Sequence, residues 1–272
     1  MKPFLRWAGG KHSQLDQILP HLTGKRLLEP FVGAGSVFMN AGFDEVIIND
    51  VNTYLTDLYS AIIHNGDYVL EKVTELSQWC NSEARYKILR DKFNSDQYNS
   101  LSKAIFFLVL NKACYNGLCR FNKSGKFNTP WGKKVNLHVP EESIRYVQDM
   151  GLNIQVCNTD FSFIFDLARE DDVIFCDPPY EPHKVEKGQG KAFTSYSGRT
   201  LLFGDQKRLV FKAKEAQARG AKVVITNSSA DHLVDFYEKS GFEIHELIAK
   251  RNISASAEKR GTVTDIIAIL KP

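Results

Sequence analysis

One stretch decides the fold of this chain: Val173-Ile174-Phe175-Cys176-Asp177-Pro178-Pro179-Tyr180. Its apolar half is typical of a buried strand, and that strand ends on the carboxylate of Asp177. Pro178 and Pro179 remove two backbone donors and fix φ, so the chain stiffens where it leaves the sheet. The carboxylate, the unpaired carbonyls and the ring of Tyr180 then share one corner. Such a corner can hold an exocyclic amino group while the ring lies over a base. The alternative is a plain turn with a solvated carboxylate.

A glycine loop precedes this stretch. Residues 26–30 predict a strand, Phe31-Val32-Gly33-Ala34-Gly35 a tight loop, and residues 36–40 the start of a helix. The glycines let the loop pass close to a ligand. The next predicted strand, residues 45–49, ends on Asp50, near the offset of about 20 residues at which an acid meets a ribose in nucleotide-binding folds.

Two kinds of nucleotide ligand suit such a loop. A dinucleotide enzyme would carry its third glycine at Phe38, and the large ring there disfavours a pyrophosphate packed against the helix. A nucleoside without phosphates, such as S-adenosylmethionine, needs only the turn and the acid. If neither binds, Asp50 would serve as a helix N-cap.

Strands and helices alternate at both ends of the chain. Further strands are expected at residues 153–157, 172–176 and 221–226, helices at 205–219 and 233–239, and a closing antiparallel pair at 242–250 and 262–270. This alternation predicts an α/β fold, with a parallel-based sheet and helices on both faces.

The middle of the chain, residues 61–145, predicts a helical insertion. Helical spacing occurs at residues 70–79, 82–93 and 101–111, and residues 120–128 predict a hairpin that turns at Ser124-Gly125. No Asp or Glu lies between residues 97 and 140, whereas seven Lys or Arg lie there among aromatic and amide side chains. Such a stretch favours a surface that tracks phosphates, and the alternative is a solvated basic face.

The remaining composition excludes several classes. The net charge of +3 is too small to indicate nucleic acid by itself. No segment approaches the ~18 uninterrupted apolar residues of a membrane span, and the N-terminus has no apolar signal region, so we expect a cytoplasmic protein without membrane contact. The five cysteines are odd in number and form no Cys-x-x-Cys pair, which gives a metal site little support. No feature predicts an obligate protein partner.

The chain carries four motifs in a fixed order: Phe4-Leu5-Arg6-Trp7-Ala8-Gly9-Gly10-Lys11, Glu29-Pro30-Phe31-Val32-Gly33-Ala34-Gly35-Ser36, Tyr115-Asn116-Gly117-Leu118-Cys119-Arg120 and Asp177-Pro178-Pro179-Tyr180. Together they resemble the DNA adenine-N6 methyltransferases, most closely the Dam type, nearly end to end. The resemblance implies a Rossmann-like S-adenosylmethionine-dependent methyltransferase sheet in residues 1–60 and 146–272. Residues 61–145 would form a mainly helical target recognition domain that carries the β-hairpin. Residues 182–199 are rich in Gly, Lys and Ser, and their position just after the Asp177 corner predicts a mobile loop that orders when DNA binds.

The resemblance implies a cofactor site for S-adenosylmethionine. Trp7 and Lys11 match the motif that helps bind the methionine part, and Asp50 matches the acid that binds the ribose. Phe31, Gly33 and Gly35 match the cofactor loop, and Asp160 and Phe161 match the position that holds the cofactor adenine. Asp177, the catalytic acid, also matches a residue of the cofactor site.

The catalytic residues implied are Asp177, Pro178 and Tyr180. The N6 lone pair of adenine is delocalised into the ring, so attack on a sulfonium methyl leaves partial positive charge on nitrogen. Asp177 and the Pro178 carbonyl would accept the two N–H bonds and stabilise that charge, while Tyr180 stacks on the base. The adenine must be flipped out of double-stranded DNA for this. No cysteine lies beside a proline in the manner of a cytosine-C5 nucleophile, which argues against that class of methyltransferase.

The resemblance also implies how the target is read. Arg6 matches the residue that contacts the first guanine, and its fork suits guanine O6 and N7. Tyr115 and Asn116 match residues that fill the gap left by flipping. The hairpin residues that read later base pairs are Leu118, Arg120 and Pro130, which makes GATC the expected site. Lys112 stands where close relatives carry arginine and is expected near the flanking phosphates.

Three alternatives stay open. One is a restriction-associated adenine methylase of another site, which the hairpin residues would distinguish. Glutamine and RNA methyltransferases usually begin the corner motif with Asn and lack the helical insertion. A non-catalytic DNA-binding module is disfavoured by the intact corner and glycine loop.

Overall fold

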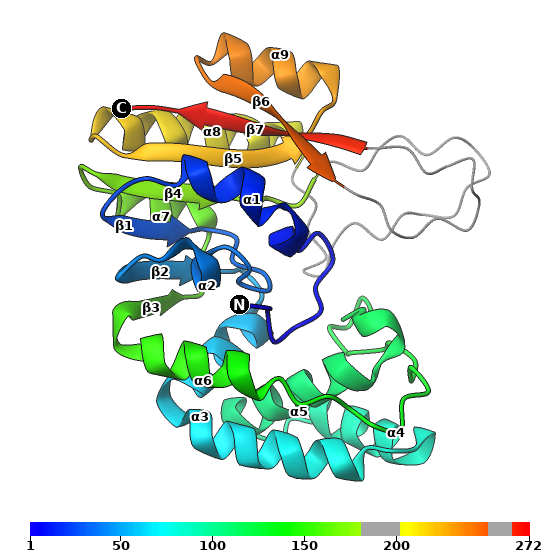
Figure 1. Ribbon diagram of the computed structural model, residues 1–272. Helices are drawn as coiled ribbons and strands as arrows, with labels where there is room; N and C mark the ends of the chain where they lie inside the picture. Colours follow the sequence, from blue (N-terminus) through cyan, green and yellow to red (C-terminus); the bar gives the residue numbers. More distant parts are fainter. Residues whose placement is uncertain (181–201, 250–262) are drawn as a thin grey trace, which may run out of the picture.

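The computed structural model describes residues 1–180, 202–249 and 263–272, so the loop predicted at residues 182–199 lies outside it (Figure 1). Within these ranges, seven strands form one sheet in the order β3-β2-β1-β4-β5-β7-β6. The strands are β1 (Arg26–Glu29), β2 (Glu45–Asn49), β3 (Ile154–Cys157), β4 (Asp172–Cys176), β5 (Lys222–Ser228), β6 (Glu243–Ala249) and β7 (Val263–Leu270). None of the helices described there is long and apolar enough to cross a membrane.

Strand direction follows the prediction. Strands β1 to β5 pair with one another in parallel, while β7 runs antiparallel to both β5 and β6. Every residue of β4 is buried, as expected of a central parallel strand covered on both faces. The α/β prediction and the closing antiparallel pair are therefore confirmed.

The two faces of the sheet pack against different helices. Leu27 and Val173 point into one core, whereas Leu28 and Ile174 point into the other, because side chains alternate along a strand. The helices are α1 (Leu15–Ile18), α2 (Phe38–Ala41), α3 (Thr53–Trp79), α4 (Glu83–Phe93), α5 (Ser100–Ala113), α6 (Glu141–Met150), α7 (Phe161–Asp166), α8 (Phe203–Ala218) and α9 (Asp231–Lys239). Helices α7, α8 and α9 cover one face, and α1, α2 and α3 cover the other.

Helices α3, α4 and α5 extend beyond the β3 edge of the sheet, with α6 beside α3 (Figure 1). The helix predicted at residues 70–79 is the second part of a longer element, α3, which is kinked at Asn65, a residue with non-helical φ and ψ. The boundaries expected at 60/61 and 145/146 fall inside α3 and α6. The same apolar core that packs on the sheet continues through these helices.

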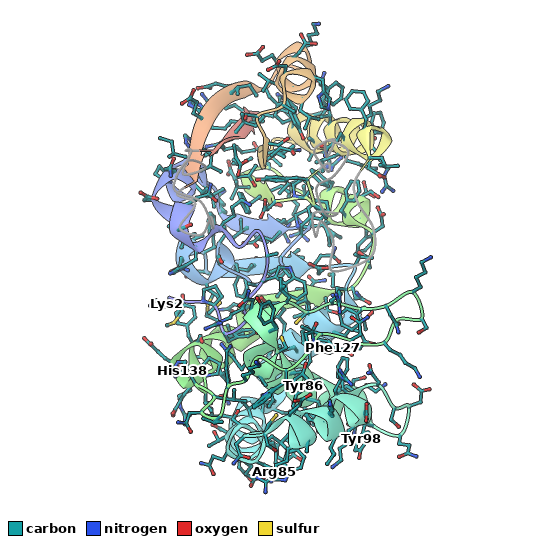
Figure 2. All side chains as sticks on the ribbon, turned by 90° about the vertical axis from the view of Figure 1, so that its right-hand side faces the viewer. Lys2, Arg85, Tyr86, Tyr98, Phe127 and His138 are labelled. Atoms are coloured by element: carbon teal, nitrogen blue, oxygen red, sulfur yellow. The ribbon has the colours of Figure 1, made fainter. Side chains whose placement is uncertain are left out.

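A small aromatic core supports the predicted hairpin in the helical part. Figure 2 shows Tyr86 and Phe127 lying inside this part of the molecule. Both side chains are almost fully buried, and the Tyr86 hydroxyl donates to the Thr129 carbonyl oxygen at 2.8 Å. Phe127 pairs across the hairpin with Phe121 in an isolated bridge, which confirms a turn near Ser124-Gly125.

The strand order reverses between β1 and β4. The chain passes outward from β1 to β2 on one side and from β4 to β5 on the other. In open α/β sheets such a reversal leaves a crevice at the carboxyl ends of the strands, where ligands bind. The glycine loop follows β1 and the Asp177 corner follows β4, so both predicted motifs lie at this crevice.

Candidate functional site at the carboxyl edge of the sheet

The Asp177 carboxylate is anchored through one oxygen. Lys11 Nζ lies 2.7 Å from Oδ1, and the Thr226 hydroxyl donates to the same oxygen at 2.8 Å. The Lys11 side chain is 6% exposed and that of Asp177 is 20% exposed, so the ion pair is poorly screened by water. The structure thus brings together two residues that lie 166 positions apart, in the first and the last of the four sequence motifs.

Tyr180 lies over this ion pair. Its ring centroid is 5.0 Å from Lys11 Nζ, within the range of a cation–π contact. The hydroxyl is buried and lies near the side chains of Thr226 and Asp177. Burial, and then the charges of Asp177 and Asp265, raise the pKa of Tyr180 well above its usual value. Tyr180 therefore supplies a neutral ring rather than a titrating group.

The glycine loop wraps the Asp50 carboxyl. Gly33 and Gly35 have φ of 49° and 74°, the left-handed region that glycine adopts without strain. Gly33 N donates to Asp50 Oδ2 at 3.2 Å, and Asn52 N donates to Oδ1 at 2.9 Å. A Cβ on Gly33 would lie 3.1 Å from Trp7 Cδ1, so the loop and the Trp7 ring are in close contact.

Burial dominates the ionisation of Asp50. It raises the pKa of Asp50 to about 6, even though the two backbone N–H groups act in the opposite direction. The N-cap of α3 is Asn52, not Asp50, which removes the simple capping role as the alternative. An acid held under the loop with spare acceptor capacity suits a ligand that donates hydroxyl groups.

Asn49 joins three segments of this site and was not identified from the sequence. It is 1% exposed. Its Nδ2 donates to the carbonyls of Pro30 at 2.9 Å and Thr159 at 3.1 Å, and its Oδ1 accepts from Thr159 N at 2.9 Å. Its own carbonyl accepts from Val32 N. The glycine loop, the end of β2 and the turn before α7 are therefore tied together.

Asp160 and Phe161 lie beside the glycine loop. Asp160 is the N-cap of α7, and Arg208 of α8 contacts its two carboxylate oxygens at 3.2 and 3.1 Å. The Arg208 guanidinium carbon is 4.3 Å from the Phe161 ring centroid, and the Phe31 and Phe161 rings are 5.3 Å apart. The structure thus brings Phe31 and Phe161 together, and the Asp160 carboxylate is engaged by Arg208.

Glu29 is a further buried acid at this edge. It is 2% exposed, and its Oε1 has no hydrogen-bond partner among the described residues. Burial raises the pKa of Glu29 well above its usual value, and the neighbouring charge of Asp177 acts in the same direction. A buried polar atom without a partner in a ligand crevice is expected to bind a ligand or water.

Asn111 connects the N-terminal segment to the end of α5. Its Oδ1 accepts from Arg6 N at 3.0 Å, and its Nδ2 donates to the carbonyls of Arg6 at 2.8 Å and Gly117 at 3.2 Å. A Cβ on Gly117 would lie 2.5 Å from Arg6 Cβ. The segment from Arg6 through Trp7 to Lys11 therefore runs from the helical part, past the glycine loop, to Asp177.

Three cations, Arg6, Lys112 and Lys134, gather near this junction, and no acid of the described residues contributes to the pKa of Lys112. Burial, and then the charges of Arg6 and Lys134, lower the pKa of Lys112 to about 8. Lys134 Nζ donates to the Lys112 carbonyl at 2.8 Å. Mutual repulsion of this kind is relieved when an anion binds.

The predicted gap-filling residues project from the same region. Tyr115 and Asn116 are exposed, and Asn116 has φ of 53°, an uncommon conformation for a residue other than glycine. Tyr115 N donates to the Pro130 carbonyl at 2.9 Å, which ties this turn to the segment that follows the hairpin. Leu118 is half-buried, and its carbonyl accepts from the Thr129 hydroxyl.

Arg120 is exposed at the base of the hairpin and held on one side. Its Nε donates to Asn128 Oδ1 at 2.8 Å and its Nη2 to the Asn128 carbonyl at 3.3 Å. Among the described residues, Nη1 has no hydrogen-bond partner. The outer edge of the guanidinium is therefore available for a bidentate contact.

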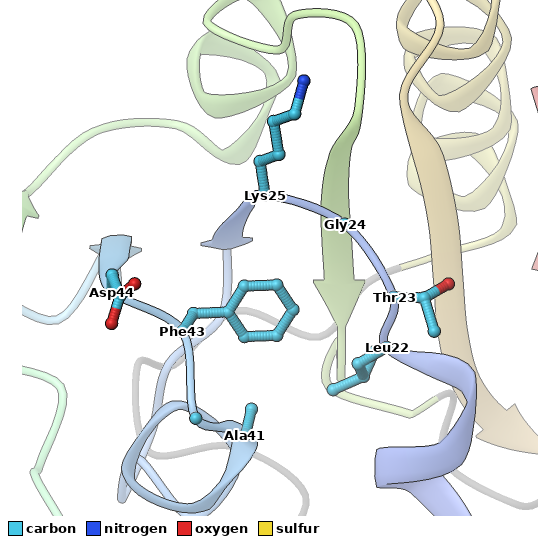
Figure 3. A pocket seen from close by; sticks show the side chains of 8 residues that line it. Leu22, Thr23, Gly24, Lys25, Ala41, Phe43 and Asp44 are labelled. Carbon is cyan, nitrogen blue, oxygen red and sulfur yellow. The ribbon is translucent and has the colours of Figure 1, made fainter.

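A surface pocket lies elsewhere, at the amino-terminal edge of the sheet. It is lined by residues 22–25, just before β1, and residues 41–44, just before β2. Figure 3 shows the Phe43 ring extending across it toward the turn at Leu22 and Thr23. Because ligands in open α/β sheets bind at the opposite edge, this pocket is not part of the candidate site. Within the described ranges, no group of three or more His, Cys, Asp or Glu could hold a metal ion.

The residues that sequence reasoning missed share one feature. Asn49, Asn111 and Thr226 are polar residues at the end of apolar runs, and all three are buried. A buried polar side chain must find partners, so such positions could have been identified as sites of tertiary hydrogen bonding. Their partners are distant in sequence and could not have been named.

Comparison with known proteins shows which family the chain resembles. The family model of the D12 class N6 adenine-specific DNA methyltransferases matches residues 7–253. A DNA N-6-adenine-methyltransferase of Escherichia phage P1 is 41% identical over 99% of this chain, which spans only 35% of that protein's length. DNA adenine methylases of Serratia marcescens and Escherichia coli K12 are 32% and 34% identical, over 99% and 100% of this chain and 98% and 96% of theirs. Among solved structures, a putative RNA methyltransferase of Pyrococcus horikoshii aligns over 100% of this chain and 89% of its own, with a TM-score of 0.40 and 12% identity.

Proposed function

Because this chain belongs to the D12 class of N6 adenine-specific DNA methyltransferases, we propose that it transfers a methyl group from S-adenosylmethionine to N6 of a flipped-out adenine within GATC. The observation that carries the proposal is the carboxyl edge of the sheet. There, the buried Lys11–Asp177 pair lies on the same crevice as the loop around Asp50.

The residues at this edge fit S-adenosylmethionine. Each Asp50 oxygen accepts one backbone N–H and retains capacity for a ribose hydroxyl. Phe31 and Phe161 offer apolar ring faces for the adenine, and Glu29 offers a partnerless oxygen to the charged methionine part. Trp7 backs the loop. The cofactor would supply an electrophilic methyl group on a sulfonium sulfur.

The catalytic corner would act by orientation and electrostatics. Asp177 and the Pro178 carbonyl accept the two N6–H bonds, which localises the nitrogen lone pair and stabilises the positive charge that develops. Tyr180 provides a neutral ring face for the base. Holding both reactants in line is the main requirement, and no covalent enzyme intermediate is needed.

The helical part would form the DNA interface. We assign residues 61–145 to target recognition and residues 1–60 and 146–272 to catalysis, with α3 and α6 shared between them. Tyr115 and Asn116 fill the gap left by the flipped base, and Lys112 contacts flanking phosphates. Arg6 reads the first guanine, and the residues that read the later base pairs are Leu118, Arg120 and Pro130. The acid-free cluster around Lys112 and the free edge of Arg120 support these roles.

The test is methylation of plasmid DNA by the purified protein. We expect resistance to a nuclease blocked by GATC methylation and cleavage by one that requires it, with N6-methyladenine as the sole modified base. Asp177→Ala protein is the matched control. Methylation of adenine outside GATC would support a restriction-associated methylase of another site, and cofactor-independent DNA binding without methylation would refute the proposed activity.

A further inference from the structure

Strand β5 places a hydroxyl group beside the catalytic acid. The parallel pairing of β4 and β5 sets Cys176 opposite Ile225, so the next residues, Asp177 and Thr226, lie side by side. Thr226 is fully buried. Its hydroxyl donates to Asp177 Oδ1 at 2.8 Å, and the Cys176 carbonyl lies farther away, at 3.4 Å.

The same oxygen also receives Lys11. A carboxylate oxygen accepts about two hydrogen bonds, so Lys11 and Thr226 together saturate Oδ1. Among the described residues, Asp177 Oδ2 has no hydrogen-bond partner. We propose that Thr226 is a positioning residue, which with Lys11 fixes Oδ1 so that Oδ2 accepts the N6–H of the target adenine. This inference rests on the proposed adenine-N6 methyltransferase activity.

Two anchors are needed because one does not determine the carboxylate plane. The terminal torsion of an Asp side chain is broad, so a carboxylate held by a single contact can rotate. The Lys11 ammonium ends a flexible four-carbon stem and can follow such a rotation. Thr226 cannot, because a β-branched side chain in a strand has a restricted χ1. Thr226 therefore fixes the orientation of the Asp177 carboxylate, and Lys11 supplies a positive charge beside it.

The end of β5 is itself held in place. Asn227, the residue after Thr226, donates to Gln206 Oε1 of α8 and to the Tyr237 hydroxyl of α9, both at 3.2 Å. The Tyr237 hydroxyl donates to the same Gln206 oxygen at 2.8 Å, and all three side chains are fully buried. This network fixes the strand from which the Thr226 hydroxyl projects.

The test compares Thr226→Ser with Thr226→Ala, two variants of nearly equal volume that differ in the hydroxyl. Single-turnover methyl transfer is measured at saturating DNA and cofactor, and the two dissociation constants are measured separately. We expect Thr226→Ala to slow transfer by about 10- to 100-fold while both dissociation constants stay within about twofold. Thr226→Ser should retain at least about a third of the wild-type rate. Thr226→Val, which keeps the shape without the hydroxyl, should match the Ala variant.

Ser77→Ala is the control, since it removes a buried hydroxyl in α3 that has no partner among the described residues. It should leave the rate unchanged. Equal rates for the Ser and Ala variants would overturn the inference, as would a loss that appears mainly in DNA or cofactor affinity. A wild-type protein that did not methylate adenine would refute the proposed function itself. A fully active Thr226→Ala protein would overturn only the role of Thr226.

Discussion

Cofactor affinity should depend on pH through Asp50. The raised pKa of Asp50, about 6, arises because burial outweighs two backbone hydrogen bonds. Ribose hydroxyls would donate to the ionised carboxylate, so the bound state favours loss of the proton. At about pH 5 the free protein must release that proton to bind, which should weaken apparent affinity about tenfold relative to about pH 7.5.

The assay is calorimetric titration with S-adenosylmethionine at several pH values, each in two buffers of different ionisation enthalpy to count released protons. Asp50→Asn should bind weakly at every pH and lose the pH dependence. Asp57→Asn is the matched control, because burial also raises the pKa of this α3 acid but it takes no part in the proposed site. An affinity that stays flat between about pH 5 and about pH 7.5 in the wild-type protein would refute the reasoning.

Folding stability should respond to the same group in the opposite sense. Folding raises the pKa of Asp50. The contribution of Asp50 to stability is therefore fully present at a pH below its pKa in the unfolded chain, and it is lost as pH rises through about 6. About two pKa units correspond to about 3 kcal/mol, an upper estimate of the penalty at neutral pH. Asp50→Asn should therefore raise the free energy of unfolding at about pH 7.5 in urea titrations.

Four further predictions concern catalysis, recognition and the cofactor loop. Asp177→Ala should reduce methyl transfer by ~10²–10³ with DNA affinity nearly unchanged, and retention of more than about a tenth of turnover would contradict its role. Lys133→Ala and Lys134→Ala should each reduce the salt dependence of binding by roughly one unit of slope for every duplex, whereas an unchanged slope would mean that these lysines only solvate a surface. Arg120→Ala should cost ~1–3 kcal/mol of discrimination at one base pair, measured as methylation rates on duplexes that each differ from GATC at one position; equal slowing of all would make Arg120 a phosphate anchor. Asn49→Ala should weaken cofactor binding about tenfold and leave DNA affinity intact, since it ties the glycine loop to the turn before α7; an equal loss of both affinities would indicate general unfolding.

Local patterns in the sequence determined the elements and the chemistry-bearing residues. The run before Asp177 is apolar on both faces, which is typical of a buried strand, and β4 begins and ends where expected. The glycines at 33 and 35 predicted a tight loop, because glycine adopts a left-handed φ without strain. The turn signal at Ser124-Gly125 likewise predicted the hairpin, which pairs Phe121 with Phe127.

Only the tertiary structure decided which of these residues meet. Helix α3, which extends the helix predicted at residues 70–79 back to Thr53 across a kink at Asn65, packs its apolar face on the sheet and on α5, a long-range effect that local propensity does not encode. Strand order and register determine three contacts: the Lys11–Asp177 ion pair, the hydrogen bonds by which Asn49 ties three segments together, and the hydrogen bond from Thr226 to Asp177. These bring together groups that are far apart along the chain, and a hydrogen bond between such groups leaves no periodic signature in sequence. The motifs therefore predicted the reacting groups, while the fold decided which oxygen of Asp177 is held by Lys11 and Thr226.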